Sequence, residues 1–236
     1  MSAFNRVENL IGKDNLERLS ASKVALFGVG GVGGFAIEAL VRSGIGEIAV
    51  FDGDIVDKTN LNRQIIATEN TIGLDKVEVI KERLLSINKD LKIYTKKVFY
   101  LPENADEIKL DGYDYIIDAV DTVSAKIEII SRAKSLNIPV ISCMGTGGKL
   151  EIEKLKVADI SKTEGCPLAR VMRRELKKRN IENVKVIYSA EDVKNQQQIK
   201  GENGKSVPSS MIFVPAVAGL YIAREVVLDL IKTKEN

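Results

Sequence analysis

The residues best suited to do chemistry in this sequence are three glycines at one turn. Gly28, Gly30 and Gly33 fit the pattern G-x-G-x-x-G within VALFGVGGVGGFAIEAL, where an apolar stretch ends and an amphipathic stretch begins. Glycines let backbone N–H groups approach a phosphate closely, and the N-terminus of the following helix adds partial positive charge. Asp52 lies about 20 residues further on, where a carboxylate can accept hydrogen bonds from ribose hydroxyls. The spacing therefore predicts a nucleotide site.

The residues after Asp52 help to distinguish a dinucleotide site from a nucleoside triphosphate site. The glycine turn alone is also typical of a nicotinamide or flavin dinucleotide site, which would make the protein an NAD-dependent oxidoreductase. An arginine and a lysine that converge on one triphosphate instead suit departing phosphates, which carry extra negative charge. The segment after Asp52 and the start of the next expected helix supply such polar and charged side chains: Asp54, Asn60, Arg63, Gln64 and Lys76. Taken singly, each cation is compatible with a solvated surface charge, and the oxidoreductase stays as the less favoured alternative.

Two carboxylates close the segment IIDAVDT. Asp118 and Asp121 stand at the end of an expected strand, at the sheet edge where open α/β proteins bind ligands. A carboxylate beside a triphosphate is the ligand that Mg²⁺ prefers. We expect Asp121 to hold the metal, because Asp118 is also compatible with capping the turn.

Composition excludes several other sites. The 236 residues include no histidine, so a Ser-His-Asp triad, a histidine zinc site and an imidazole base are absent. The two cysteines are too few for a four-thiolate zinc site. Cys143 ends an apolar strand and is expected in the core, whereas Cys166 is either structural or a reactive thiol. A net charge of +2 with 29% charged residues is typical of an ordinary soluble surface, and the cysteine usage fits a reducing cytoplasm.

Strand-like and helix-like stretches alternate through the nucleotide-binding core, which we place at residues 23–148. Short apolar runs predict strands at 23–28, 47–52, 91–98, 113–121 and 138–143. Amphipathic runs predict helices from the glycine turn to about Ser43, at about 74–88 and at about 124–136. This order demands a parallel sheet with right-handed crossovers. The fold class is therefore α/β, a doubly wound Rossmann-like, mostly parallel sheet.

The two ends of the chain complete one expected domain of residues 1–236. Residues 1–22 mix charged and apolar positions, which predicts an amphipathic N-terminal helix and no membrane span. Residues 149–236 are expected to form an appended α+β substrate region with a strand at 149–160, a basic helix at 167–179 and a strand at 183–189. The polar stretch 191–210 predicts a mobile loop.

The apolar run 211–231 is long enough to suggest a membrane helix. Pro215, Arg224, Glu225 and Asp229 interrupt it, so a buried core helix is favoured.

Four segments in their order and spacing, GVGGVG, DGDIVDKTNLNRQ, GLDKVE and DAVDT, resemble the ThiF/MoeB/HesA superfamily, which is related to the ubiquitin-activating enzymes. The resemblance covers most of residues 4–144. It implies a ligase that uses magnesium ATP to adenylate a carboxylate and release pyrophosphate. By motif position, it implies that Gly30 and Gly31 hold phosphate, that Asp52 binds the ribose and that Asp121 binds Mg²⁺. The same resemblance assigns the phosphates to Asn60, Arg63 and Lys76.

The N-terminal segment FNRVENLIG is similar to that of the family, in which an arginine reaches the active site of the other subunit. The resemblance therefore implies a homodimer in which Arg6 completes the partner's site. The residue alone is equally compatible with an exposed helix arginine.

Members that adenylate the C-terminus of a ubiquitin-like sulfur carrier often bind zinc through two C-x-x-C pairs, and this sequence has none. The resemblance then favours the branch that acts on tRNA, the threonylcarbamoyladenosine dehydratases. That branch implies adenylation of the carboxylate of threonylcarbamoyladenosine in tRNA, followed by cyclisation with loss of water and release of AMP. Adenylation of a sulfur-carrier protein stays open as an alternative, and some relatives imply a sulfur-relay or desulfurase partner.

The expected helix at 167–179 carries six cations within ten residues. Like charges on one helix repel each other unless a polyanion neutralises them. We expect four of these residues to contact the tRNA backbone, and a solvated basic face is the alternative: Arg173, Arg174, Lys177 and Lys178.

Overall fold

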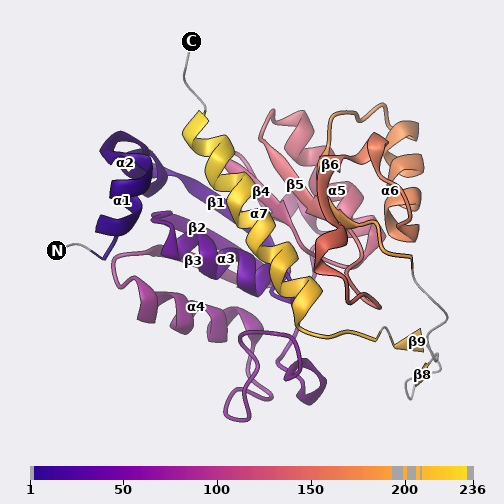
Figure 1. The fold of residues 1–236 in the computed structure, drawn as a ribbon, viewed down its shortest axis with the longest axis horizontal. Coiled ribbons are helices and arrows are strands. Elements are labelled where there is room, and N and C mark those ends of the chain that lie inside the picture. The colour runs from indigo at the N-terminus through magenta and orange to yellow at the C-terminus, as the bar shows by residue number, and fades with distance from the viewer. Residues whose placement is uncertain (1–2, 193–198, 201–205, 208, 233–236) are drawn as a thin grey trace.

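The computed structural model describes residues 3–192, 199–200, 206–207 and 209–232. Their main sheet has the strand order β3-β2-β1-β4-β5-β7-β6 (Figure 1). The strands are β1 Lys23–Phe27, β2 Glu47–Asp52, β3 Lys92–Lys97, β4 Tyr115–Asp118, β5 Val140–Cys143, β6 Leu155–Asp159 and β7 Lys185–Ser189. All neighbouring strands in this sheet are parallel except β6, which runs antiparallel to β7. The predicted mostly parallel sheet is confirmed.

The strand order reverses beside β1, because β1 pairs with β2 on one side and with β4 on the other. Such a reversal leaves a crevice at the carboxyl ends of the two central strands, since their connections leave toward opposite faces. The chain from β1 enters α3 (Gly33–Arg42), whereas the chain from β4 enters α5 (Val123–Ser135). The topology therefore places the glycine turn and the segment DAVDT side by side.

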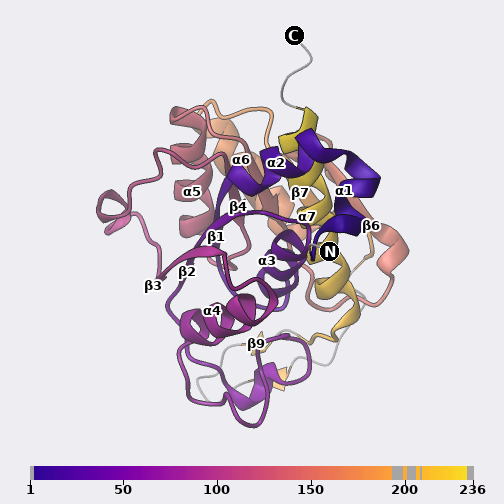
Figure 2. The same cartoon turned by 90° about the vertical axis from the view of Figure 1, so that its left-hand side faces the viewer.

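Helices cover both faces of the sheet (Figure 2). One face packs against α3, α4 (Lys76–Ile87) and α7 (Phe213–Lys232), and the other packs against α5 and α6 (Pro167–Lys178). Strand β1 is buried along most of its length, as expected for a parallel strand covered on both sides. Short 3-10 turns lie at Lys58–Asn60, Ala105–Glu107, Ile152–Lys154 and Ile160–Lys162.

The prediction of a single N-terminal helix is wrong in the number of helices. Two helices occupy this segment, α1 (Asn5–Ile11) and α2 (Lys13–Ala21), and Gly12 separates them. Gly12 has φ 85° and ψ 159°, a backbone conformation outside the helical region that glycine adopts without a steric penalty. The charge pattern continues through Gly12, so periodicity alone did not show the break.

The C-terminal part extends the main sheet, because β7 pairs in parallel with β5 and carries β6 at the edge. The strand expected at 149–160 begins only at Leu155, after a 3-10 turn. Of the predicted loop 191–210, much lies outside the described residues, and β8 (Ile199–Lys200) pairs with β9 (Ser206–Val207) within it.

The helix α7 is the buried core helix that the sequence predicted. A Cβ on Gly219 would lie 2.5 Å from the carbonyl oxygen of Val32, so this glycine lets α7 approach the start of α3 closely. Within the described residues, no helix combines the length and apolar character needed to cross a membrane.

Candidate active site

The carboxyl ends of the central strands border one cleft of about 870 Å³. Nearly all the residues predicted to bind the nucleotide line it: Gly28, Gly30, Gly31, Asp52, Asp54, Asn60, Arg63, Gln64, Lys76 and Asp121. Gly33 lies directly behind them as the first residue of α3. The fold thus brings together residues that are up to 93 positions apart in sequence, as the numbers 28 and 121 show.

The glycines of the first glycine loop, residues 28–33, have two different roles. A Cβ on Gly28 would lie 2.7 Å from the carbonyl oxygen of Ala119, and a Cβ on Gly33 would lie 1.9 Å from that of Gly28. Both positions exclude a side chain because strand, loop and helix pack tightly there. By contrast, no atom lies within 4 Å of a Cβ built on Gly30. Gly30 therefore faces open space, which leaves room for a ligand to approach the backbone.

The backbone of this loop offers hydrogen-bond donors. In the described part of the chain, the N–H groups of Gly30, Gly31 and Val32 have no protein acceptor. No side chain caps the N-terminus of α3 either. Unsatisfied N–H groups at a helix N-terminus attract anions because they add to the positive end of the helix dipole. The loop is therefore suited to hold phosphate.

Asp52 fixes the first glycine loop to the end of β2. Its Oδ2 accepts a hydrogen bond of 2.6 Å from the N–H of Val29, and its Oδ1 accepts one of 2.8 Å from the N–H of Asp54. Burial raises the pKa of Asp52, although the charge of Lys76 and these N–H donors oppose that shift. The carboxylate thus combines a structural role with a position in the cleft where it can meet a ribose.

The two predicted phosphate-binding cations have different surroundings. Lys76 is buried at the start of α4, and its Nζ lies 2.8 Å from Oδ2 of Asp54, which is half exposed. Arg63 donates from Nη1 to the carbonyl oxygen of Thr59 at 2.8 Å and to Oδ1 of Asn62 at 3.0 Å. Both cations are therefore held by the protein rather than extended into solvent.

Arg63 also lies close to the first glycine loop. A Cβ on Gly31 would lie 3.4 Å from Cγ of Arg63 and 3.3 Å from Cβ of Pro215 in α7. A Cβ at Gly31 would require Pro215 to shift by a few tenths of an ångström and would touch the stem of Arg63, so this glycine leaves room for both beside the N–H donors.

Two buried polar atoms in the cleft lack hydrogen-bond partners among the described residues: Oε1 of Gln64 and the hydroxyl of Tyr100. Asn60, by comparison, accepts a hydrogen bond of 3.1 Å from the N–H of Asp57. Burial raises the pKa of Tyr100 to about 12, so its hydroxyl stays protonated at neutral pH. Unsatisfied buried polar groups are costly, which indicates that a polar ligand completes this site.

The two carboxylates of DAVDT have separate surroundings. Asp118 is fully buried, and its Oδ2 accepts from Oγ of Ser142 at 2.5 Å and from Nζ of Lys126 at 3.1 Å. This network makes Asp118 unavailable to a metal. Asp121 is exposed in the cleft, and its carboxylate contacts the hydroxyl of Thr122 at 3.4 Å. Among the residues that the structure describes, no three metal-ligating side chains gather at one point.

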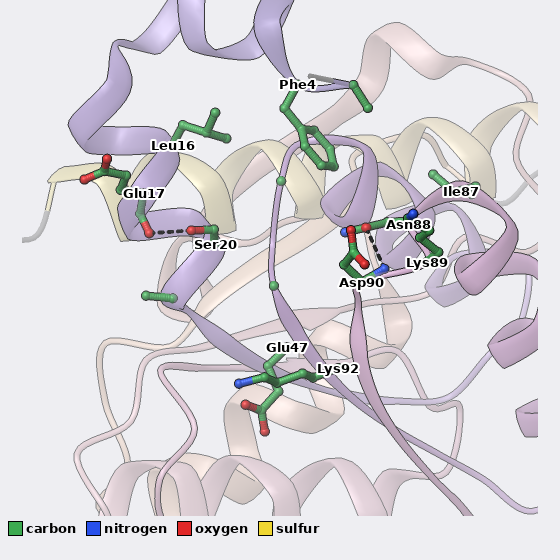
Figure 3. A pocket seen from close by; sticks show the side chains of 14 residues that line it. Phe4, Leu16, Glu17, Ser20, Glu47, Ile87, Asn88, Lys89, Asp90 and Lys92 are labelled. Carbon is green, nitrogen blue, oxygen red and sulfur yellow. Dashed lines mark hydrogen bonds between the residues drawn. The ribbon is translucent and has the colours of Figure 1, made fainter. Parts of the chain in front are cut away.

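Arg6 lies away from the cleft of its own chain. Figure 1 shows α1 at the amino ends of the strands, the opposite edge of the sheet. There, Phe4 lines a second hollow of about 800 Å³ together with Glu47 at the start of β2 and Lys92 at the start of β3 (Figure 3). Arg6 is exposed on this side. Within one chain it therefore does not join the predicted site residues.

Both cysteines are buried. Burial raises the pKa of Cys143 to about 12, which keeps its thiol protonated and unreactive, as expected of a core residue. Cys166 precedes α6 and lies near Gly145 at the cleft wall, where it is 4% exposed. This low exposure favours its structural role over that of a reactive thiol.

The basic helix α6 is partly neutralised from within. Glu175 pairs with Lys178 at 2.8 Å, with Arg179 at 3.0 Å and with Arg174 at 3.4 Å. These cations lower the pKa of Glu175 to about 2. Arg173 is half buried and donates to the carbonyl and hydroxyl oxygens of Thr163. Neither feature was predicted from the sequence.

Several cleft residues escaped the sequence analysis. Phe99 and Tyr100 follow β3 at the carboxyl edge, and Phe99 packs over Gly53. Their position directly after a predicted strand was the available signal. Lys149 also lines the cleft, and Asn62 connects Arg63 to the carbonyl oxygen of Ser210 through a hydrogen bond of 2.8 Å.

Comparison with known proteins identifies the family of this chain. The family model described as "ThiF family" matches residues 4–236. The chain belongs to the ThiF family. This ThiF-family chain is 43% identical over 243 residues to the tRNA threonylcarbamoyladenosine dehydratase of Bacillus subtilis, covering 98% of this chain and 96% of the relative. It is 40% identical over 175 residues to the corresponding Haemophilus influenzae protein, covering 74% and 67% of the two chains.

Solved structures of a ThiF-family relative include complexes with nucleotides. The Escherichia coli tRNA N6-threonylcarbamoyladenosine dehydratase, TcdA, in complex with ATP has a TM-score of 0.88 and 30% sequence identity to this chain. The alignment covers 98% of this chain and 94% of that one. An AMP complex of the same enzyme matches equally well, with a TM-score of 0.88.

Proposed function

We propose that this ThiF-family chain is an ATP-dependent tRNA-modifying ligase, a tRNA threonylcarbamoyladenosine dehydratase. It adenylates the free carboxylate of threonylcarbamoyladenosine in tRNA and then closes that group into a ring. One observation carries the proposal. A cleft that contains free backbone N–H groups for a phosphate and two cations fixed by the protein occurs in a chain that matches a dehydratase over 96% of the relative's length. We further propose that residues 1–236 work as one adenylation domain in the cytoplasm.

The first step follows from the charges in the cleft. An oxygen of the substrate carboxylate forms a bond to the α-phosphorus of ATP, and the bond from that phosphorus to the bridging oxygen of pyrophosphate breaks. The N–H donors at Gly30 and Gly31, together with Arg63 and Lys76, stabilise the negative charge that collects on pyrophosphate. Asp52 orients the nucleotide through its ribose.

The second step is intramolecular. A nucleophilic group of the same modification attacks the acyl carbon, and the bond from this carbon to the AMP oxygen breaks. AMP leaves, the attacking group loses its proton, and the product contains one water fewer than the substrate. Because the nucleophile and the acyl carbon belong to one molecule, positioning supplies much of the rate, and the absence of histidine is no obstacle.

The residues present fit a magnesium ion. Mg²⁺ commonly takes one or two carboxylates together with substrate phosphates and water. Asp121 offers a single exposed carboxylate at the edge of the cleft, which agrees with such a mixed set of ligands. Bound there, Mg²⁺ would supply charge neutralisation for the phosphates.

The functional unit we propose is a homodimer. Arg6 lies at the opposite edge of the sheet from its own cleft, so it can serve a nucleotide only in a second copy. Mixing the inactive variants Arg6→Ala and Lys76→Met should restore about a quarter of the activity, because a quarter of the sites then combine both intact residues. No recovery on mixing refolded chains would contradict the exchange. A sulfur-relay or desulfurase partner remains a prediction from the resemblance.

The tRNA is proposed to lie against the exposed cations of α6. Lys177 has no anionic partner within the described residues, whereas Arg174 and Lys178 share Glu175 and Arg173 is tied to Thr163. This ranks Lys177 first among the four predicted contacts.

The decisive experiment combines the purified protein with ATP, Mg²⁺ and tRNA that carries threonylcarbamoyladenosine. Mass spectrometry of the nucleosides should show the modification lose one water while AMP and pyrophosphate accumulate in equal amounts. Unmodified tRNA is the control and should give no AMP. AMP formation that instead requires a small sulfur-carrier protein would establish the alternative activity, and hydride transfer to NAD would establish an oxidoreductase.

A further inference from the structure

A second glycine loop, residues 145–149 with the sequence GTGGK, lies at the carboxyl end of β5 and lines the same cleft. Its last residue, Lys149, is 3% exposed. A lysine is rarely buried to this extent unless its charge is paired.

The ammonium group of Lys149 has backbone partners only. Its Nζ donates to the carbonyl oxygen of Ser189 at 3.1 Å and to that of Glu191 at 2.5 Å. No carboxylate in the described part of the chain forms an ion pair with it. The carboxylate of Glu191 is already used, because it accepts from the N–H groups of Leu150 and Glu151 at 2.9 Å each. The structure therefore fixes a buried positive charge and leaves it without a counter-ion.

Free backbone donors precede Lys149 in the second glycine loop. The N–H groups of Gly145, Thr146 and Gly147 have no acceptor among the described residues, whereas the neighbouring N–H of Met144 donates to Ile187. Successive backbone N–H groups that converge in a turn can form a concave donor site for an anion. The second glycine loop thus brings a cation and several N–H groups to the wall of the same cleft.

The second glycine loop lies on a different side of the cleft from the first glycine loop, which we propose holds phosphate. The first glycine loop follows β1, and the second follows β5, with β4 between the two strands. Segment 209–210 spans the two sides, because the N–H of Gly148 donates to Ser209 and the side chain of Asn62 donates to Ser210. A ligand at the second loop therefore shares the cleft with a nucleotide held at the first.

We infer that the second glycine loop is the subsite for the carboxylate that attacks ATP, with Lys149 as its counter-ion. This inference rests on the proposed function. A carboxylate must approach a triphosphate of like charge, so a fixed cation on the acceptor side offsets that repulsion. Lys149 and the N–H groups of Gly145 and Thr146 recognise the acid end of the substrate, and they leave ATP to Arg63 and Lys76.

The test is a binding cycle without turnover. Two anticodon stem-loops are compared, one with threonylcarbamoyladenosine and one in which its carboxylate is a carboxamide, each in the presence of Mg²⁺ and a non-hydrolysable ATP analogue. The native protein should prefer the carboxylate by about tenfold or more, the range for a hydrogen-bonded charge. Lys149→Met should bind both stem-loops equally, and Lys149→Arg should keep the preference.

Controls separate this role from a general loss of structure. Lys154→Met removes a nearby exposed lysine that pairs with Glu151, and it should behave like the native protein. The affinity of Lys149→Met for the ATP analogue should stay within about twofold, as expected for a site that the nucleotide does not use. Thermal melting checks folding, and Lys149→Gln replaces Lys149→Met in the same cycle if the latter unfolds.

Several outcomes would overturn the inference: a carboxylate preference that survives in Lys149→Met, an equal loss of affinity for both stem-loops, or weakened binding of the ATP analogue alone. Turnover of modified tRNA by the native protein is measured beside the cycle. If turnover occurs and the preference survives, only the Lys149 subsite fails. If modified tRNA gives no AMP at all, the proposed function fails and the inference fails with it.

Discussion

The two glycine loops of the cleft obtain positive charge in different ways. The first loop leads into α3, a helix of ten residues whose free N–H groups carry a partial positive charge. The second loop leads into a 3-10 turn and then β6, so no α-helix stands behind it. It contains its own cation, Lys149, held by backbone carbonyl groups. On our inference, Lys149 supplies at the second loop the positive charge that the helix dipole supplies at the first.

The largest expected effect tests whether the nucleotide side of the cleft, to which Lys76 belongs, and the second glycine loop have separate functions. Lys76→Met should lower the rate of AMP formation by about 10²–10³-fold, because it removes a donor to the departing charge. Its preference for the carboxylate stem-loop should persist, the reverse of Lys149→Met. The fold should tolerate the change, since the remaining partner Asp54 is half exposed and stays hydrated.

Steady-state AMP release and the binding cycle measure these two properties. Lys81→Met is the matched control, a partly exposed lysine on the same helix. Loss of the carboxylate preference in Lys76→Met would show that the nucleotide side of the cleft and the second glycine loop do not have separate functions.

Alanine substitutions at two glycines of the first loop should differ by about 1–3 kcal/mol in their effect on the free energy of unfolding. Gly33→Ala places a methyl group on the carbonyl oxygen of Gly28, and overpacking of this kind costs about that much or more. Gly30→Ala meets open space and should change the free energy of unfolding by less than about 0.5 kcal/mol. It should nevertheless weaken ATP binding. Urea unfolding and nucleotide titration measure the two effects. Equal destabilisation would contradict the open space at Gly30, and unchanged ATP affinity in Gly30→Ala would refute its assignment to a ligand.

Removal of one exposed cation from the basic helix α6 should have a smaller effect, a several-fold loss of tRNA affinity at moderate salt. Lys177→Ala should weaken tRNA binding and reduce the slope of log K against log salt by about 1, the change for one lost phosphate contact. Lys178→Ala should do less, because Glu175 already neutralises Lys178. Affinity is measured across a salt series, with Lys13→Ala at the opposite edge as control. Slopes equal to that of the native protein in all three variants would favour a solvated basic face.

The smallest effect concerns pH. Burial raises the pKa of folded Asp52 above the ordinary value of 3.8. The ionised carboxylate therefore weakens the fold at neutral pH, and this cost is removed as the pH falls through the folded pKa. The free energy of unfolding of the native protein, relative to that of Asp52→Asn, should therefore increase as the pH falls from about 7 to about 4. Urea unfolding at both pH values measures it, and a constant difference would contradict the shift.

Local pattern was sufficient for the fold class and for the first loop. Alternating apolar and amphipathic stretches gave the parallel sheet because strand and helix periodicity depend on neighbours along the chain. Gly28, Gly30 and Gly33 were identifiable because a strand-to-helix turn has a fixed spacing. The same pattern did not show that Gly12 splits the N-terminal helix, since charged and apolar residues continue in helical register on both sides.

The sequence by itself determined the αβ order, the exclusion of histidine chemistry and the position of the glycine turn that we propose binds phosphate. Only the tertiary structure decided which of Asp118 and Asp121 is free, and that Lys149 is buried without a carboxylate partner. The reason is physical. A spacing pattern reflects contacts between near neighbours, whereas the state of a charge depends on Ser142, Ser189 or Glu191, which reach it only through the pairing of distant strands.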